Sequence, residues 1–127
     1  MAAQIRNAAG LCLDVHAPDM QTNGGKIQLW DCNGSAQQEW YLEGDRIRNA
    51  GGFCLDIHRP DIVTNGGHVQ IWECNSSIQQ RWEVVGKSIQ NLAGLCLDGH
   101  RPDLLTNGAK VQVWECNGLI QQQWTFE

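Results

Sequence analysis

The chain has 127 residues, of which 42% are hydrophobic and 18% are charged, and its formal net charge is −5. This balance is typical of one globular domain and excludes a disordered chain, which would hold fewer apolar residues. Nucleic acid is disfavoured as a partner because phosphate binding needs clustered Lys and Arg. No apolar run approaches the roughly 20 residues of a membrane span, so membrane insertion is not expected. The first stretch, MAAQIRNAAG, has no hydrophobic signal region, so no secretion signal is expected within this chain.

The first unit contains four short runs rich in Ile, Val, Leu or Trp, separated by turn residues, as β-strands are. The expected strands lie near Gln4–Asn7, Leu11–Val15, Lys26–Trp30 and Glu39–Leu42. Pro18 and the run Asn23-Gly24-Gly25 supply turn residues between them, and no segment has a helical period. The unit is therefore expected to be entirely β.

A period of 42 residues repeats this unit along the chain. Three cysteines and three tryptophans show the interval most clearly. They are Cys12, Cys54 and Cys96, and Trp40, Trp82 and Trp124. The repeats span 1–43, 44–85 and 86–127 without linkers, so residues 1–127 are expected to form a single domain. Because closing three units on one another covers most strand edges, the predicted fold is an all-β β-trefoil with pseudo-threefold symmetry.

Strand alternation predicts one aliphatic and one polar face in each unit. In LCLDV (11–15) and KIQLWDC (26–32), the Leu, Ile and Val residues share a face that must point to the core. The remaining residues are expected to lie together on the outside. They are Cys12, Asp14, Gln28, Trp30 and Cys32; then Cys54, Asp56, Gln70, Trp72 and Cys74; and Cys96, Asp98, Gln112, Trp114 and Cys116.

The cysteines of each unit lie 20 positions apart on this predicted outer face. The spacing lacks the close pairs typical of zinc sites, so no metal site is expected. The repeat favours bridges within each unit over other pairings, and the alternative is six reduced cysteines that fill space. The favoured bridges are Cys12–Cys32, Cys54–Cys74 and Cys96–Cys116. Such bridges would indicate an oxidising compartment and hence a secreted or extracellular protein.

The two tryptophans of each unit are expected to differ. Trp40 follows two glutamines and begins a closing strand with Leu42 on its own face, which predicts a core position for Trp40, Trp82 and Trp124. Trp30 lies among polar residues instead. Either Trp30, Trp72 and Trp114 are exposed for binding, or each lies flat over the neighbouring disulfide.

These segments together resemble the ricin B-type (R-type) lectins, also called the family 13 carbohydrate-binding modules. The resemblance covers the whole chain and depends on three CLD segments, three QxWxC segments and three Gln-x-Trp triplets in fixed order. The triplets are Gln38–Trp40, Gln80–Trp82 and Gln122–Trp124. The family implies a β-trefoil with a shallow sugar site in each unit and with no cofactor.

The resemblance also implies roles for the residues that match the family pattern. Asp14, Asp56 and Asp98 would bind two adjacent sugar hydroxyls, and Trp30, Trp72 and Trp114 would stack on the sugar. Gln28, Gln70 and Gln112 match a flanking polar contact, whereas Gln38, Gln80 and Gln122 match the residue that steadies the Asp. The family often has Asn at the place of Gln37, Gln79 and Gln121, where a longer amide would alter which hydroxyls are read.

The HAPD and HRPD segments that follow each Asp allow two interpretations. His16, His58 and His100 either touch a ligand at the rim of each site or simply precede a Pro turn. The next carboxylates, Asp19, Asp61 and Asp103, are expected to belong to that turn.

The sequence predicts binding rather than catalysis. No nucleophile is paired with a base, and each predicted site has one carboxylate where a glycosidase needs two. The leading hypothesis is a lectin with up to three equivalent sites for galactose or N-acetylgalactosamine-type glycans, acting by multivalent binding. The alternatives are the sugar-binding module of an enzyme or toxin directed at another glycan such as xylan, and a trefoil for protein interaction or inhibition with silent sites.

Overall fold

The computed structural model describes residues 2–100 and 105–127 as short strands joined by turns and single-turn 3-10 helices. The strands are β1 (Ala2–Ala3), β2 (Ile5–Asn7), β3 (Leu11–Val15), β4 (Gly25–Asp31), β5 (Trp40–Glu43), β6 (Arg46–Asn49), β7 (Cys54–Ile57), β8 (Gly67–Trp72), β9 (Trp82–Val85), β10 (Ser88–Asn91), β11 (Leu95–Gly99), β12 (Ala109–Glu115) and β13 (Trp124–Phe126). The 3-10 turns are η1 (Ala17–Asp19), η2 (Ala36–Gln38), η3 (Arg59–Asp61), η4 (Ile78–Gln80) and η6 (Ile120–Gln122). No helix among these residues is long and apolar enough to cross a membrane.

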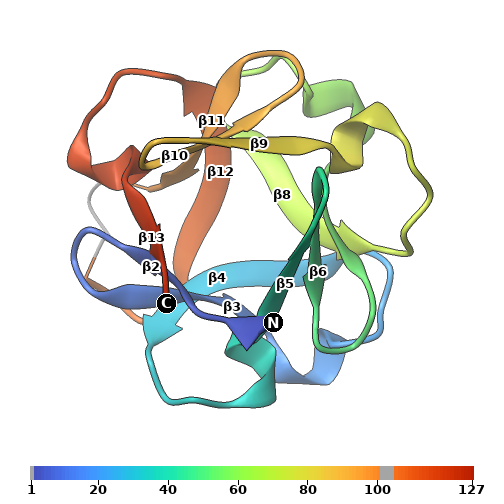
Figure 1. Cartoon of the computed structure of the whole chain (residues 1–127), viewed down its shortest axis with the longest axis vertical. Helices are drawn as coiled ribbons and strands as arrows, with labels where there is room; N and C mark the ends of the chain where they lie inside the picture. Colours follow the sequence, from blue (N-terminus) through green and yellow to red (C-terminus); the bar gives the residue numbers. More distant parts are fainter. Residues whose placement is uncertain (1, 101–104) are drawn as a thin grey trace.

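The units close on one another through two sets of strand pairs (Figure 1). Within the units, the hairpins β3–β4, β7–β8 and β11–β12 are antiparallel. The start of each second hairpin strand pairs with the end of its counterpart in the next unit, as Gly25 does with Ile71, so that β4, β8 and β12 form a ring. The hairpins β5–β6 and β9–β10 join consecutive units, and β13–β2 joins the last unit to the first. This closure confirms the predicted β-trefoil.

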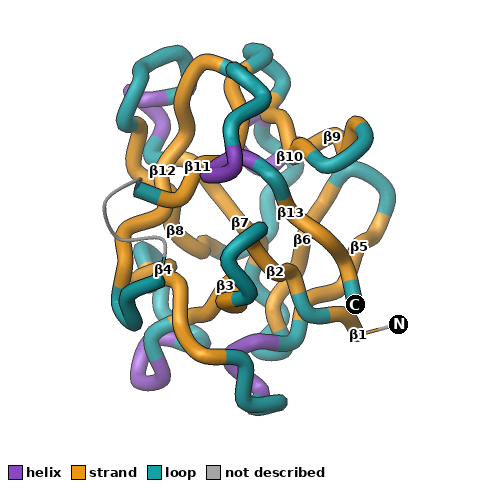
Figure 2. Tube along the Cα trace, turned by 90° about the vertical axis from the view of Figure 1, so that its left-hand side faces the viewer, coloured by secondary structure: helices purple, strands orange, loops and turns teal. Residues whose placement is uncertain are grey.

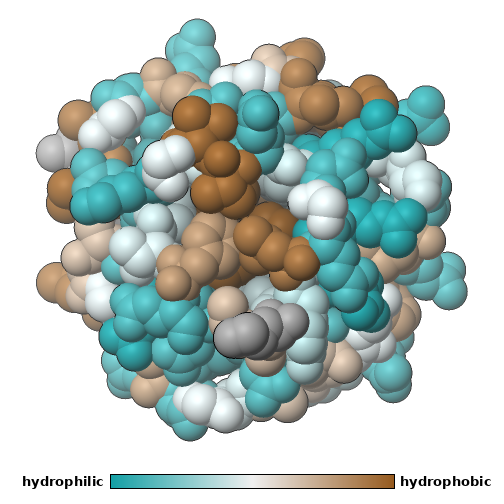
Figure 3. All heavy atoms as spheres, viewed as in Figure 1, coloured by the Kyte–Doolittle hydropathy of each residue, from teal (hydrophilic) through white to brown (hydrophobic). Residues whose placement is uncertain are grey.

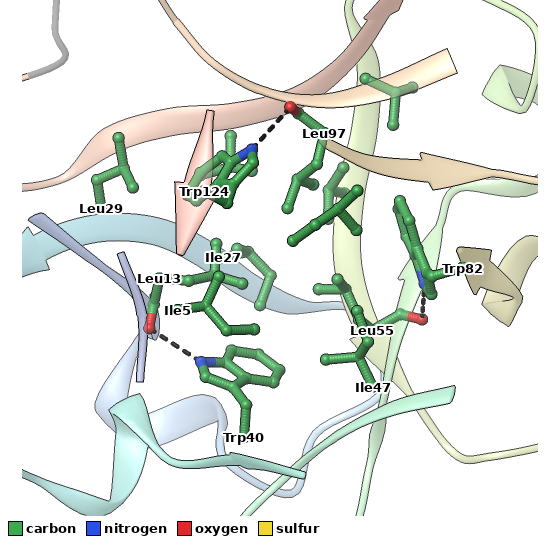
Figure 4. Packing of buried hydrophobic residues seen from close by; sticks show 14 of the residues in the cluster. Ile5, Leu13, Ile27, Leu29, Trp40, Ile47, Leu55, Trp82, Leu97 and Trp124 are labelled. Carbon is green, nitrogen blue, oxygen red and sulfur yellow. Dashed lines mark hydrogen bonds between the residues drawn. The ribbon is translucent and has the colours of Figure 1, made fainter. Parts of the chain in front are cut away.

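The three tryptophans of the Gln-x-Trp triplets lie in the core, as predicted (Figure 4). Trp40, Trp82 and Trp124 are at most 4% exposed. Their indole N–H groups donate to the carbonyl oxygens of Leu13, Leu55 and Leu97, each at 3.0 Å. A buried indole with a satisfied donor contributes apolar area without stranding a polar group. The core therefore consists of one large aromatic per unit surrounded by the aliphatic faces of the strands.

Leu42 differs from the expectation that it shares the buried face of Trp40. Its side chain is 44% exposed, and that of Val84 on β9 is 41% exposed. Figure 3, which has the same view as Figure 1, shows apolar side chains gathered near the middle of the face that the viewer sees. A hollow of about 460 Å³ lies there, lined by Leu42, Ile47 and Val84 among others. Leu42 pairs with the buried Ile47 of β6 in the strand register, so it lies beside the core but borders the hollow, which leaves its side chain exposed.

The structure joins the cysteines within each unit. The bridges are Cys12–Cys32, Cys54–Cys74 and Cys96–Cys116. Each bridge links the first strand of a hairpin to the segment that follows the second strand, and closing a loop of this size stabilises a chain by about 3 kcal/mol in the chain-entropy model. Figure 2 shows loops and short 3-10 turns at the periphery of the strands.

Candidate functional site

The carboxylate of each CLD segment is held between two glutamine amides. Oδ1 of Asp14 accepts a hydrogen bond from Nε2 of Gln28 at 3.0 Å, and Oδ2 accepts one from Nε2 of Gln38 at 2.9 Å. The other units repeat this arrangement, with distances between 2.9 and 3.1 Å. Each carboxylate oxygen can accept about two hydrogen bonds. Both oxygens therefore keep acceptor capacity for one further donor.

Gln38 is fixed by contacts on both ends of its amide. Besides Asp14, its Nε2 donates to the carbonyl of Asp31 at 2.8 Å, and its Oε1 accepts from the backbone N–H of Asn33 at 2.9 Å. Gln80 and Gln122 make the same contacts in their units. With its donors and acceptor engaged, this glutamine orients the carboxylate, which is the steadying geometry that the family pattern implies.

The polar face is less exposed than the sequence indicated. Asp14 is 3% exposed and Gln28 is 6% exposed. Cys12 and the counterparts of all three residues in the other units are buried as well. The reason is that η2 folds back over β3 and brings Gln38 against Asp14. Of the predicted outer set in the first unit, only Trp30 is exposed, while Cys32 is half-buried.

Burial raises the pKa of Asp14 above its ordinary value of 3.8. The hydrogen bonds from Gln28 and Gln38, and the nearby His16, lower the pKa but do not cancel the effect of desolvation. The pKa values of Asp56 and Asp98 are raised in the same way. Because the amide N–H groups need acceptors, they favour the ionised carboxylate, whereas burial disfavours it.

The tryptophan of each QxWxC segment lies half-exposed beside this carboxylate. Trp30 on β4 sits opposite Cys12 of β3 in the strand register, next to the disulfide. Trp30 and Trp72 are 38% exposed and Trp114 is 39% exposed. The indole is thus neither a fully buried lid over the disulfide nor a free surface side chain. It offers part of its ring to solvent from a defined place.

In the second unit these residues surround a shallow hollow of about 170 Å³. Five of the predicted residues line it, namely Asp56, His58, Gln70, Trp72 and Gln79. Gln80 instead lies behind the carboxylate of Asp56. The lining also includes Arg59, Pro60 and Asn75, which the sequence analysis missed as site residues. The sequence gives little indication of them, because they lie in turns, and the path of a turn decides which strand residues it approaches.

His58 occupies both of the places that the sequence left open for the histidines. His58 lines the hollow and also precedes the Pro turn, with its Nδ1 3.6 Å from Oδ2 of Asp61. His16 is 3.5 Å from Asp19 in the same arrangement, and the backbone N–H of His100 donates to the carbonyl of Lys110 at 2.9 Å.

The carboxylates after the histidines belong to the turn, as expected. Oδ2 of Asp19 accepts from the backbone N–H of Lys26, and Oδ2 of Asp61 accepts from that of His68, each at 3.1 Å. Asp103 lies outside the described residues. Within residues 2–100 and 105–127, no group of three His, Cys, Asp or Glu side chains is placed to hold a metal ion.

The glutamines at the family's usual Asn position differ between units. Gln37 and Gln79 are half-buried. Gln121 is only 7% exposed, and in the described part of the chain its buried Oε1 has no hydrogen-bond partner. A buried acceptor left unpaired costs about 1–3 kcal/mol. The glutamine of the third unit is therefore buried where its two counterparts are half-buried.

A β-trefoil with a recessed carboxylate and a half-exposed tryptophan in each unit defines a carbohydrate-binding class of protein. The chain belongs to the ricin-type beta-trefoil lectin domain family, whose profile matches residues 1–124. Domains of this family are carbohydrate-binding modules. A search of curated protein sequences gives no match.

Several solved structures share the fold. The designed threefold-symmetric protein ThreeFoil is 19% identical, with a TM-score of 0.82 over 98% of this chain and 96% of that one. The agglutinin from Abrus precatorius is 27% identical, with a TM-score of 0.86 over 99% of this chain and 48% of that one. The C-half of the earthworm R-type lectin, solved in complex with GalNAc, is 22% identical, with a TM-score of 0.81 over 99% and 97% of the two chains. This chain thus spans about half of the agglutinin chain and nearly all of the other two.

Proposed function

We propose that residues 1–127 form a lectin with up to three equivalent sites for galactose or N-acetylgalactosamine-type glycans. The observation that carries the proposal is a carboxylate clamped by two amides beside a half-exposed tryptophan, repeated in every unit. Protein interfaces have no reason to repeat such a set three times around an axis. The lectin hypothesis accounts for the repetition because each set is one sugar site.

The chemistry of the set matches the two sides of a pyranose ring. The spare acceptor positions on the two oxygens of Asp56 suit two adjacent sugar hydroxyls, and hydrogen bonds to a charged acceptor are the stronger kind. The half-exposed ring of Trp72 suits the C–H face of the sugar, because contact between them removes apolar area from water. A galactose-type sugar has an axial hydroxyl that leaves one broad, continuous apolar face for such stacking. The hydroxyl edge and the apolar face are thus met by different residues.

The glutamines one residue before the steadying glutamine provide additional support. Gln79 lines the hollow of the second unit together with Asp56 and Trp72. Its side-chain amide can both donate to and accept from a sugar hydroxyl. The solved complex of the earthworm lectin with GalNAc supports the same class of sugar for this chain.

One such site makes few contacts, so we expect weak binding of a single sugar, near millimolar or about −4 kcal/mol. Several sites on a rigid trefoil raise avidity on a glycan-coated surface by about 10²–10⁴ without new contacts. Function then consists of retention on, or cross-linking of, multivalent glycans without catalysis. Three disulfides suit an oxidising, extracellular location for this activity.

A glycan array followed by calorimetry tests the proposal. Trp→Ala variants should be used at one, two and three of the positions Trp30, Trp72 and Trp114, because removing Asp14 would strand two buried amide donors. We expect the stoichiometry for N-acetylgalactosamine to fall from about three in steps of one, and agglutination to be lost once two sites are gone. A wild-type stoichiometry of one, or a triple variant that still agglutinates in a sugar-inhibitable way, would overturn the proposal.

A further inference from the structure

Each half-exposed tryptophan rests against a turn that belongs to the preceding unit. The second unit's Trp72 lies beside Gly24 of the first unit, where a Cβ atom would be 3.8 Å from Cζ3 of the indole. Gly66 stands in the same relation to Trp114 at 3.7 Å, and Gly108 to Trp30 at 3.9 Å. Gly24 has a φ of +84°, which disfavours any residue with a side chain. The glycine therefore lets the turn approach the ring closely.

The same turn holds the main chain on both sides of the tryptophan. The backbone N–H of Gly24 donates to the carbonyl of Ile71 at 2.8 Å. Oδ1 of Asn23 accepts from the backbone N–H of Glu73 at 2.7 Å, and Nδ2 of Asn23 donates to Oε1 of Glu73 at 3.2 Å. Trp72 thus lies between two residues that are both tied to another unit.

We call these contacts of the Asn-Gly pair with the main chain around the tryptophan the clamp, and it recurs in the other two units. Asn65 makes the two contacts with Glu115 at 2.7 and 3.2 Å, and Asn107 makes them with Asp31 at 2.7 and 3.0 Å. The backbone bonds from Gly66 to Val113 and from Gly108 to Leu29 recur as well. Each asparagine is 50 positions before its partner in two cases, and 76 positions after it where the ring closes.

We propose that the asparagine of each Thr-Asn-Gly turn is a positioning residue for the stacking tryptophan of the following unit. The inference rests on the proposed function, since it makes each sugar site the product of two units. Asn65 sets the Trp114 site, Asn23 sets the Trp72 site, and Asn107 sets the Trp30 site. The asparagine acts through the main chain that flanks the indole and holds the ring at one edge while leaving part of it open for a sugar. A stacking ring must be held close to its productive geometry, or the affinity of the site falls.

The first test uses no sugar. In protein labelled with 5-fluorotryptophan, the six ¹⁹F resonances can be assigned by single Trp→Phe variants. We expect Asn65→Ala to shift the Trp114 resonance and to leave that of Trp72, the tryptophan of its own unit, unchanged. Asn23→Ala should shift the Trp72 resonance instead. A shift confined to the tryptophan of the mutated unit, or no shift at any of the three exposed tryptophans, would overturn the inference.

The second test measures one site at a time. A Trp30→Ala/Trp72→Ala background retains only the third site, whose affinity for N-acetylgalactosamine is followed by calorimetry or by ligand-observed NMR. Because coupled contacts modulate affinity modestly, we expect Asn65→Ala to weaken binding about three- to tenfold. Asn23→Ala is the matched control, since in this background its target Trp72 is already absent. Equal weakening by both substitutions would reduce the clamp to a general contribution to folding.

Exchanging the donor and the acceptor of the side-chain hydrogen bond between Asn65 and Glu115 separates positioning from loss of structure. Asn65→Asp keeps an acceptor for the backbone N–H of Glu115 but sets two carboxylates against each other. Adding Glu115→Gln restores a donor and acceptor pair in the opposite sense. The single variant should weaken the third site, and the double variant should recover most of the affinity; failure of the recovery would contradict the proposal. If the background binds no glycan on an array while the ¹⁹F shifts follow the expected pattern, the lectin proposal fails and the positioning inference stands.

Discussion

The two tryptophans of each unit share a residue type and a period but have different surroundings. Trp40 is fully buried, and its N–H is paired with the carbonyl of Leu13. Trp30 is 38% exposed and lies beside the disulfide and the turn of another unit. The difference shows that a repeated aromatic residue need not have one role. One class builds the core, and the other presents a ring at the surface.

The largest expected effect tests the core class. Trp40→Ala removes a fully buried aromatic and leaves a cavity, so we expect a loss of about 3–5 kcal/mol in the free energy of unfolding. Denaturant titration with the disulfides intact would measure it. Trp40→Phe is the matched control, because it keeps most of the apolar volume but strands the carbonyl of Leu13. Its cost should be smaller than that of Trp40→Ala, and a cost below 1 kcal/mol for the alanine variant, against about 3–5 expected, would remove Trp40 from the core class.

The next effect concerns Gln38, which holds the carboxylate of Asp14. Gln38→Ala leaves the carbonyl of Asp31, the N–H of Asn33 and one oxygen of Asp14 without a protein partner. We expect a loss of about 1–3 kcal/mol in the free energy of unfolding, since water reaches some of these groups. Sugar affinity at the first site should also fall, measured in a Trp72→Ala/Trp114→Ala background.

Gln38→Glu sharpens this prediction. The variant preserves the acceptor for Asn33 but places a second carboxylate against Asp14. Like charges at this distance disfavour joint ionisation, so its destabilisation should be greater at neutral pH than in acid. A variant that is equally stable at both pH values would show that Gln38 does not hold an ionised carboxylate.

Much of this architecture could be predicted from the sequence, because a period of 42 residues and strand alternation are local signals. They were sufficient for the trefoil and for the core position of Trp40. The burial of Asp14 could not be predicted, because it depends on η2, whose Gln38 is 24 residues away along the chain. The contact of Asn23 with Glu73, 50 residues away, depends on how two units meet. Alternation assigns a residue to a face of its strand but does not show what later covers that face.

A smaller effect on stability is expected for the exposed class. Trp30→Ala should lower the free energy of unfolding by about 1–2 kcal/mol, less than Trp40→Ala does, because 38% of Trp30 is already exposed to water. It should nevertheless remove one sugar per chain in calorimetry. Trp30→Tyr should retain part of the binding, since a phenol also offers a flat ring. If Trp30→Ala unfolded the protein as readily as Trp40→Ala, the distinction between the classes would collapse.

The smallest expected effect on stability comes from pH, and it separates binding from folding. Burial raises the folded-state pKa of Asp14, Asp56 and Asp98 above 3.8, so the folded protein takes up protons at a higher pH than the unfolded chain. These groups therefore contribute stability that is fully present below pH 3.8 and is lost as the pH rises through the raised pKa.

Sugar binding has the opposite dependence on pH, because a protonated carboxyl gives up acceptor capacity at the point where a hydroxyl must donate. As the pH is lowered from neutral, we expect sugar affinity to begin to fall while the pH is still above 3.8. Protonation of these carboxyls should not lower the free energy of unfolding over the same pH range. Parallel calorimetry and denaturant titrations would measure the two quantities; affinity that persists below 3.8, or that falls only where the protein unfolds, would contradict a role for the buried carboxylates in binding.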